Sequence, residues 1–304
     1  MNGALTSRQR RLILDRAYQI RRLTVELITA GRWGHLAGAL SMADILATLY
    51  FRELEVDPTN PSRPDRDRLV LSKSHASPSL YCALALRGFF PVEELYRYAE
   101  IDGILEGHAD MTRTPGLESS GGLLGLGLSI AQGMALAQRF NEQFRARTFC
   151  IMGDGEQNEG GIWEAAMSAA HFKLDNLIGI LDYNRIMSKG FVADVMGIEP
   201  IADKWRSFGW DVLEVDGHDV DELALAFYRA RWVIPRGRPV MIIAHTVKGK
   251  GLTVAENSYR WHTHYPSPDL ADAMLRDLAR NYGRPEEGYS RLGLPHEEEE
   301  TFSV

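Results

Sequence analysis

Short apolar runs that alternate with helical patterns constrain the fold of this chain more than any other feature. Four runs have the length and composition of buried strands, and helical patterns over 129–141, 159–172 and 219–231 separate or precede them. The strand-like runs cover residues 147–152, 177–182, 211–215 and 239–245. Parallel strands need a crossover connection, which is usually a helix. The alternation therefore predicts an α/β fold, three layers deep, with a mainly parallel central sheet.

The N-terminal part of the chain predicts further helices. Apolar side chains recur with a helical period over residues 7–30, where Ser7 is a candidate N-cap, and a second helix is expected over 41–51. The glycine-rich stretch at 119–133 predicts a loop that enters a helix.

Composition excludes several classes of protein. The chain has 304 residues, of which 45% are hydrophobic, and its net charge of −7 makes nucleic acid an unfavourable partner. We find no apolar span of membrane length and no signal-peptide pattern, so we expect a cytoplasmic protein. Cys82 and Cys150 each lie in an apolar run, as reduced core residues do.

A carboxylate between two glycines marks the end of one strand-like run. In FCIMGDGEQNEGGIWEAA (149–166) the run stops at Gly153, and Asp154 and Gly155 follow. Alone, this pattern is also typical of a strand-to-helix turn capped by an Asp. The next run, LIGILDYNRI, ends with Asp182 and then Asn184, thirty positions after Asp154. Because the carboxyl ends of parallel strands share one edge of a sheet, these oxygen ligands are expected to hold one Mg²⁺ together with phosphate oxygens.

The segment that joins these two ends, GDGEQNEGGIWEAAMSAAHFKLDNLIGILDYNR, resembles the thiamine diphosphate signature in its transketolase version. Further segments resemble transketolases in the same order: GHLAGALSMADILATLYF, DRLVLSKSHASPSLYCALALRGF, EGHADMTRTPGLESSGGLLGLGLSIAQGMALA and HTVKGKGLTVAENSYRWH. The resemblance covers about residues 10–265 and only the N-terminal, diphosphate-binding domain of a transketolase. It implies the thiamine diphosphate-binding fold.

This resemblance implies a coenzyme and a metal. Thiamine diphosphate would bind with Mg²⁺, for which Ca²⁺ or Mn²⁺ can substitute, and the metal ligands would be the side chains of Asp154 and Asn184 and the carbonyl of Ile186. The other residues expected to meet the coenzyme are Gly122, Leu124, Gly153, Gly155, Glu159, Lys73 and Lys248.

Four of the nine histidines match active-site histidines of transketolases. The resemblance assigns His75 and His262 to diphosphate and reacting-centre contacts, His35 to proton transfer, and His108 to the C1 hydroxyl of a donor ketose. Imidazoles suit these roles because they donate, accept or transfer protons near neutral pH.

The resemblance also implies a partner, because the pyrimidine-binding and C-terminal domains of a transketolase are missing. We expect a split enzyme in which a second subunit carries both, most simply as an α2β2 heterotetramer that acts on small sugar or ketose-type substrates. Glu159 matches a residue that faces the partner across the interface. The expected domain boundaries are 1–265 for the diphosphate-binding domain and 266–304 for an extension with an acidic tail.

The expected reaction is transfer of a two-carbon ketol unit from a ketose-type donor to an aldehyde. Trp33, Leu36, Leu126 and His264 depart from the usual transketolase pattern near the substrate channel. These departures disfavour the ordinary sugar phosphates and favour a specialised two-carbon transfer, on a modified sugar or in natural-product assembly. Two alternatives stay open: another thiamine-dependent carboligase that decarboxylates a 2-oxo acid, as 1-deoxyxylulose-phosphate synthases do, and a non-catalytic regulatory subunit.

Overall fold

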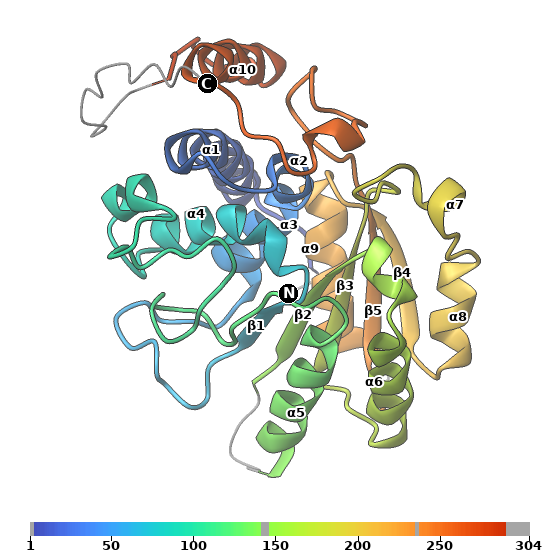
Figure 1. Cartoon of the computed structure of the whole chain (residues 1–304). Helices are drawn as coiled ribbons and strands as arrows, with labels where there is room; N and C mark the ends of the chain where they lie inside the picture. Colours follow the sequence, from blue (N-terminus) through green and yellow to red (C-terminus); the bar gives the residue numbers. More distant parts are fainter. Residues whose placement is uncertain (1–2, 141–145, 235–236, 290–304) are drawn as a thin grey trace.

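A five-stranded parallel sheet forms the centre of the molecule in a computed structural model that describes residues 3–140, 146–234 and 237–289. The strand order is β1-β2-β3-β5-β4, and every neighbouring pair is parallel (Figure 1). The strands are β1 (Arg68–Leu71), β2 (Thr148–Gly153), β3 (Leu177–Tyr183), β4 (Asp211–Asp216) and β5 (Val240–His245). All carboxyl ends therefore meet at one edge of the sheet.

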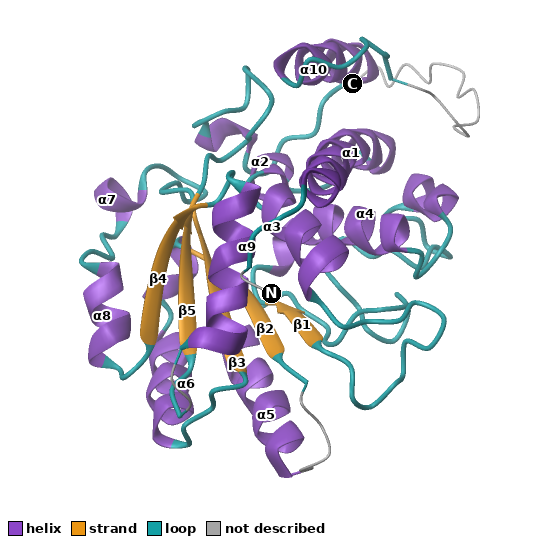
Figure 2. Ribbon diagram, turned by 180° about the vertical axis from the view of Figure 1, so that it is seen from behind, coloured by secondary structure: helices purple, strands orange, loops and turns teal. Residues whose placement is uncertain are grey.

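Helices cover both faces of this sheet. On one face lie α5 (Gly127–Phe140), α6 (Gly160–His171) and α8 (Ile201–Ser207), and on the other lies α9 (Val220–Tyr228) (Figure 2). The remaining helices are α1 (Ser7–Gly31), α2 (Leu36–Leu40), α3 (Ala43–Thr48), α4 (Ser77–Arg87), α7 (Val192–Val195) and α10 (Pro268–Asn281), with short turns η1 (Leu49–Glu53), η2 (Ser74–Ala76), η3 (Val92–Arg97), η4 (Gly155–Asn158), η5 (Arg229–Val233) and η6 (Tyr259–Trp261).

Two hydrophobic cores result, one on each face. Along β2, Phe149 and Ile151 belong to the core shared with α1, α3, α4 and α9, whereas Cys150 and Met152 belong to the core shared with α5 and α6. This alternation follows from the two-residue period of a strand. Because both faces are covered, β2 is apolar throughout and shows no polar alternation.

The predicted α/β architecture with a parallel sheet is confirmed, and all four predicted strands are present. Strand β1 was not predicted, because only four residues pair at the edge of the sheet. The helix expected over 41–51 is divided: α3 ends at Thr48 and the π-type turn η1 continues to Glu53. The N-cap of α1 is Thr6, not Ser7, because Thr6 and Gln9 form a reciprocal capping box.

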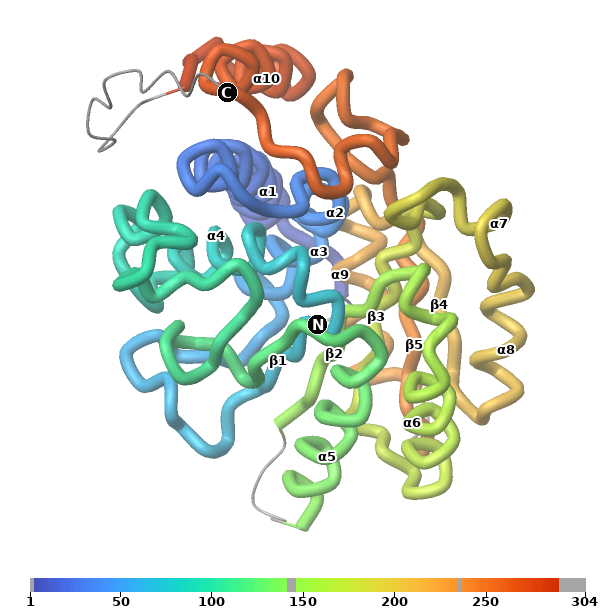
Figure 3. The backbone as a smooth tube through the Cα atoms, viewed as in Figure 1, coloured from blue at the N-terminus to red at the C-terminus, as the bar shows by residue number. Residues whose placement is uncertain are grey.

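Helix α10 lies beside α1 (Figure 3). Its side chains Met274, Leu275 and Leu278 are buried in the same core as Ile13 and Ile20 of α1. The boundary expected at residue 265 stays a prediction, and the acidic tail lies outside the described residues.

None of the helices that the structure describes is long and apolar enough to cross a membrane. Cys82 and Cys150 are both free and buried, as the sequence predicts.

Candidate active site

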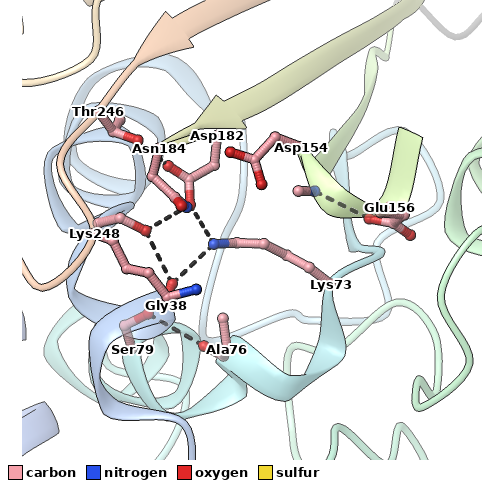
Figure 4. Close-up of polar contacts among 12 residues, drawn as sticks. Gly38, Lys73, Ala76, Ser79, Asp154, Glu156, Asp182, Asn184, Thr246 and Lys248 are labelled. Carbon is pink, nitrogen blue, oxygen red and sulfur yellow. Dashed lines mark hydrogen bonds and ion pairs between the residues drawn. The ribbon is translucent and has the colours of Figure 1, made fainter. Parts of the chain in front are cut away.

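The predicted site residues gather where β1, β2, β3 and β5 end. Asp154 directly follows β2 and Asn184 directly follows β3, and the register pairs Gly153 with Asp182. Lys73 follows β1, and Lys248 follows β5. Figure 4 shows these side chains pointing toward one another from separate segments of the chain.

Asp154 is held by backbone amides. Its Oδ1 accepts from the N–H of Gly155 at 2.7 Å, and its Oδ2 accepts from the N–H of Arg185. Burial, together with the nearby Asp182 carboxylate, raises the pKa of this carboxyl to about 6, against the effect of the backbone donors and Lys248. A carboxylate that is buried without a strong cationic partner is suited to receive a cation.

The turn after β3 carries two more oxygen donors, the side-chain amide of Asn184 and the backbone carbonyl of Ile186, and the N–H of Arg185 between them donates to Asp154. The Asn184 Oδ1 accepts from the N–H of Ile186 at 3.1 Å, and both residues are buried. One carboxylate, one amide and one carbonyl are hard oxygen donors, which fit Mg²⁺ or Ca²⁺ when substrate or coenzyme oxygens complete the shell. Within the described ranges, no three His, Cys, Asp or Glu side chains are arranged to hold a metal, so this set draws on the amide and the carbonyl instead.

Lys73 and Asp182 form a buried ion pair that sequence reasoning missed. The Lys73 ammonium donates to Asp182 and, at 2.8 Å, to the carbonyl of Gly38. Burial opposes ionisation of Asp182, but Lys73 and the hydroxyls of Ser41 and Thr246 together hold its pKa below the ordinary value. The signal in the sequence was the Asp two positions before Asn184.

Lys248 connects the turn after β3 to a histidine. Its Nζ donates to the carbonyl of Ile186 at 2.7 Å and to Nδ1 of His262 at 3.0 Å. Burial lowers the pKa of Lys248 to about 8, although Asp154 partly offsets this effect. The contact with Ile186 reaches one of the predicted metal ligands.

The four predicted histidines form one cluster. The ring centroid of His35 lies 5.2 Å from that of His75, 5.2 Å from that of His262 and 6.1 Å from that of His108. Burial lowers the pKa of His35 to about 4 and that of His262 to about 3, with Lys248 adding to both shifts. Burial also lowers the pKa of His75 and of His108. All four imidazoles are therefore neutral at pH 7 in this structure.

Trp33 closes one side of this cluster. Its ring lies 5.6 Å from His35 and 5.4 Å from His108, centroid to centroid. It also lines a cavity of about 600 Å³ with His108, Glu106 and Asp110.

Three of the predicted residues are exposed. Gly122 has a φ of +150° with open space where a Cβ would stand, so a larger side chain there would strain the backbone. Leu124 and Glu159 also face solvent. Glu156, which sequence analysis did not single out, is buried beneath them and accepts from the N–H groups of Gly125 and Gly153 at 2.8 and 3.0 Å.

The fold and the site together define a coenzyme-binding domain in which polar groups converge at the carboxyl edge of a parallel sheet. The family described as transketolase, thiamine diphosphate binding domain, matches residues 14–290. The chain belongs to this family.

Relatives of similar length are subunits. A 6-deoxy-6-sulfo-D-fructose transketolase subunit, SqwG, from Clostridium sp. (strain MSTE9) is 43% identical over 86% of this chain and 94% of its own length. An apulose-4-phosphate transketolase subunit from Phocaeicola vulgatus is 38% identical over 85% of this chain and 91% of its own length. These likenesses make the chain a transketolase-like, diphosphate-binding subunit, as the sequence predicts.

Larger transketolases contain the same fold. The solved transketolase from Leishmania mexicana has a TM-score of 0.84 at 28% identity, over 91% of this chain but 42% of that chain. The human transketolase-like protein 2 is 34% identical over 87% of this chain and 42% of its own length. This chain thus spans about two fifths of these larger proteins.

Proposed function

We propose that this subunit binds thiamine diphosphate with Mg²⁺ and, with a partner subunit, transfers a two-carbon ketol unit from a ketose-type donor to an aldehyde acceptor. The observation that carries the proposal is the gathering of Asp154, Asn184 and Ile186 beside four neutral histidines. A regulatory scaffold needs neither group.

The chain's own residues divide into binding and proton-handling groups. Asp154, Asn184 and the carbonyl of Ile186 hold the metal, and Gly153 and Gly155 let the backbone approach the diphosphate. When bound, thiamine diphosphate would supply a nucleophilic carbon and an electron sink for the cleavage of the donor's carbon–carbon bond.

The histidines orient the donor and move its protons. His35 is only partly buried, so its ring can meet a donor hydroxyl and exchange a proton with it, although its Nδ1 is itself buried and has no hydrogen-bond partner among the described residues. His108 contacts the C1 hydroxyl, and His75 and His262 contact the diphosphate and the reacting centre. Lys248 supplies positive charge next to the Ile186 carbonyl, and Lys73, paired with Asp182, helps to shape the coenzyme side of the site.

A partner subunit completes the site. Exposed apolar side chains lie on α6, which begins directly after Glu159, and on the segment that contacts this helix: Met167 on α6, Ile130 on α5 and Leu126 on the loop before α5. We assign this apolar surface to contact with a subunit that carries the pyrimidine-binding and C-terminal domains, in an α2β2 assembly.

We further propose a modified ketose as the donor. Trp33, which departs from the usual transketolase pattern, narrows the approach to His35 and His108 and lines the cavity beside them. The two relatives described above act, by their names, on a sulfonated fructose and on apulose 4-phosphate.

Calorimetric titration tests the cofactor and the partner together. We expect Mg²⁺-dependent binding of thiamine diphosphate to the mixture of this chain and its partner, and loss of that binding in Asp154→Asn. The matched control is Asp194→Asn, which changes an exposed Asp on α7 and leaves binding unchanged. Binding that persists in Asp154→Asn would contradict the proposed metal site.

Donor assays separate the two remaining alternatives. Release of carbon dioxide from pyruvate by the complex would favour a decarboxylating carboligase over ketol transfer. A complex that forms but neither binds the coenzyme nor turns over a ketose would favour the regulatory subunit.

A further inference from the structure

Asp182, at the carboxyl edge of the sheet, accepts hydrogen bonds from four side chains of the described residues. It is fully buried, and it accepts hydrogen bonds from Ser41 Oγ at 2.5 Å, from Lys73 Nζ and from Thr246 Oγ1. These three donors come from the segment after α2, the loop after β1 and the loop after β5. A carboxylate with no exposed surface cannot contact a substrate, so any role of Asp182 must act through the side chains around it, of which Figure 4 shows Lys73, Asn184 and Thr246.

The fourth donor to Asp182 is the amide of Asn184. Asn184 Nδ2 lies 3.3 Å from Asp182 Oδ2, and on the other side Asn184 Oδ1 accepts from the N–H of Ile186 at 3.1 Å. An ionised carboxylate only accepts hydrogen bonds, so the NH2 end of the amide must face Asp182 and its oxygen must face away. The orientation of this amide is thereby fixed.

We propose that Asp182 is a positioning residue that orients the Asn184 amide so that its oxygen, and not its nitrogen, is offered to the metal. The inference rests on the proposed function, because it assumes that Asn184 is a metal ligand. An amide turned the other way would present an N–H group to a cation and repel it. Partners of this kind around metal ligands typically change metal affinity by about 10- to 100-fold when they are lost.

Two double variants separate orientation from charge. Lys73→Met/Asp182→Asn and Lys73→Met/Asp182→Leu both remove the buried ion pair, which avoids leaving one charge without a partner. The first keeps a side-chain oxygen at position 182 that accepts from the Asn184 amide, and the second removes that oxygen. Loss of Lys73 is common to both, so a difference between them reports on the side chain at position 182.

The first readout needs neither metal nor coenzyme. Solvent exchange of the Asn184 side-chain amide protons is measured by NMR on the full chain, and these signals are assigned by their absence in Asn184→Asp. We expect slow exchange in the wild type and in the variant with Asp182→Asn, and faster exchange in the variant with Asp182→Leu. Equal exchange in the two double variants would overturn the proposal.

The second readout is Mn²⁺ binding to the complex with thiamine diphosphate, followed by the electron paramagnetic resonance signal of free Mn²⁺. We expect the variant with Asp182→Leu to bind Mn²⁺ about tenfold or more weakly than the variant with Asp182→Asn. Equal affinities would show that Asp182 only stabilises the fold. A wild-type complex that binds no Mn²⁺ would instead overturn the proposed metal site, while the exchange measurement would still report whether Asp182 holds the amide.

Discussion

His35 illustrates how burial sets the protonation of a single residue. Its ring faces three other imidazoles, His75, His108 and His262, and the Lys248 ammonium also lies close enough to act on it. A proton on His35 would place a positive charge in a partly buried site that already lies near the Lys248 ammonium. Burial, with His108 and Lys248, therefore lowers the pKa of His35 to about 4.

This shift predicts a pH dependence of stability. Unfolded His35 takes up a proton below its ordinary pKa of about 6.5, whereas folded His35 stays neutral down to a pKa of about 4. Its contribution to stability is thus complete above pH 6.5 and is lost as the pH falls toward 4. We expect His35→Gln to lose less stability than the wild type between pH 7 and 4.5 in urea denaturation.

The exposed His264 provides the control for this measurement. His264→Gln should show the same loss of stability as the wild type over this range. If His35→Gln loses as much stability as the wild type between pH 7 and 4.5, the inference that folded His35 stays neutral in this range is wrong.

Trp33 depends on a glycine for its position. A Cβ added to Gly107 would stand 2.6 Å from the Trp33 ring. Gly107→Ala should therefore push the ring from its place and lower the free energy of unfolding by about 1–3 kcal/mol. In a double-mutant cycle, Trp33→Leu should relieve most of this loss, because the smaller side chain leaves room for the methyl group.

Gly133→Ala is the matched control, since a Cβ there would meet no atom within 4 Å. In this helical position we expect a gain of about 0.5–1 kcal/mol. A Gly107→Ala effect that Trp33→Leu does not change would show that another contact limits the space at Gly107.

Among the elements, the loop after β5 is held at both ends by a buried network. His218 Nδ1 donates to Asp44 at 2.7 Å, and His218 Nε2 accepts from the N–H of Val247 at 2.8 Å. Arg21 pairs with the same Asp44 and donates to the carbonyl of Lys250 at 3.1 Å. The network fixes the backbone on either side of Lys248. The structure thus gives His218 a structural role.

His218→Phe should loosen this loop. The change leaves the N–H of Val247 without a buried acceptor, which costs about 1–3 kcal/mol of unfolding free energy. We also expect faster hydrogen exchange at Val247. His171→Phe, on the exposed end of α6, is the control and should change neither quantity. Unchanged exchange at Val247 in His218→Phe would mean that other contacts hold the loop.

Across the molecule as a whole, the helix layers on the two faces of the sheet leave some apolar side chains exposed. Helices α1, α3, α4, α9 and α10 share the core over one face, and α5 and α6 cover the other (Figures 1 and 2). Helices α5 and α6 also carry apolar side chains that are exposed to solvent. Met167 on α6 is 58% exposed and Ile130 on α5 is 37% exposed. An apolar surface next to a coenzyme site is what a split enzyme requires of its interface.

Met167→Glu should prevent assembly with the partner subunit. A charge buried in the interface without a partner is unfavourable, so light scattering after gel filtration should return the mass of the single chain, 34.1 kDa. Trp232→Glu is the matched control. Trp232 is 62% exposed, and the carbonyl of its neighbour Arg231 bonds to Arg147 at the amino end of β2, away from the site. Assembly that survives Met167→Glu would move the interface elsewhere.

Residue order alone was enough to predict the architecture and the positions of Asp154 and Asn184 at neighbouring strand ends. Apolar runs of strand length that alternate with helical periods leave few arrangements other than a parallel sheet covered on both faces. The spacing of Asp154 and Asn184 placed them at two neighbouring strand ends, because each follows its strand directly. Strands, helices and the residues that follow them directly can be read from local periodicity, which is a property of the sequence.

The buried side chains that support the candidate site could be identified only in the assembled fold. Lys73 and Asp182 are 109 positions apart, and His218 and Asp44 are 174 apart, so no local pattern reveals either pair. The low pKa values of the histidines likewise come from a cluster that four separate segments build. Burial and contacts between distant segments exist only once the sheet has assembled. Residues without a recognisable local pattern, such as Asp182 and His218, can therefore be assigned a supporting role only from the tertiary structure.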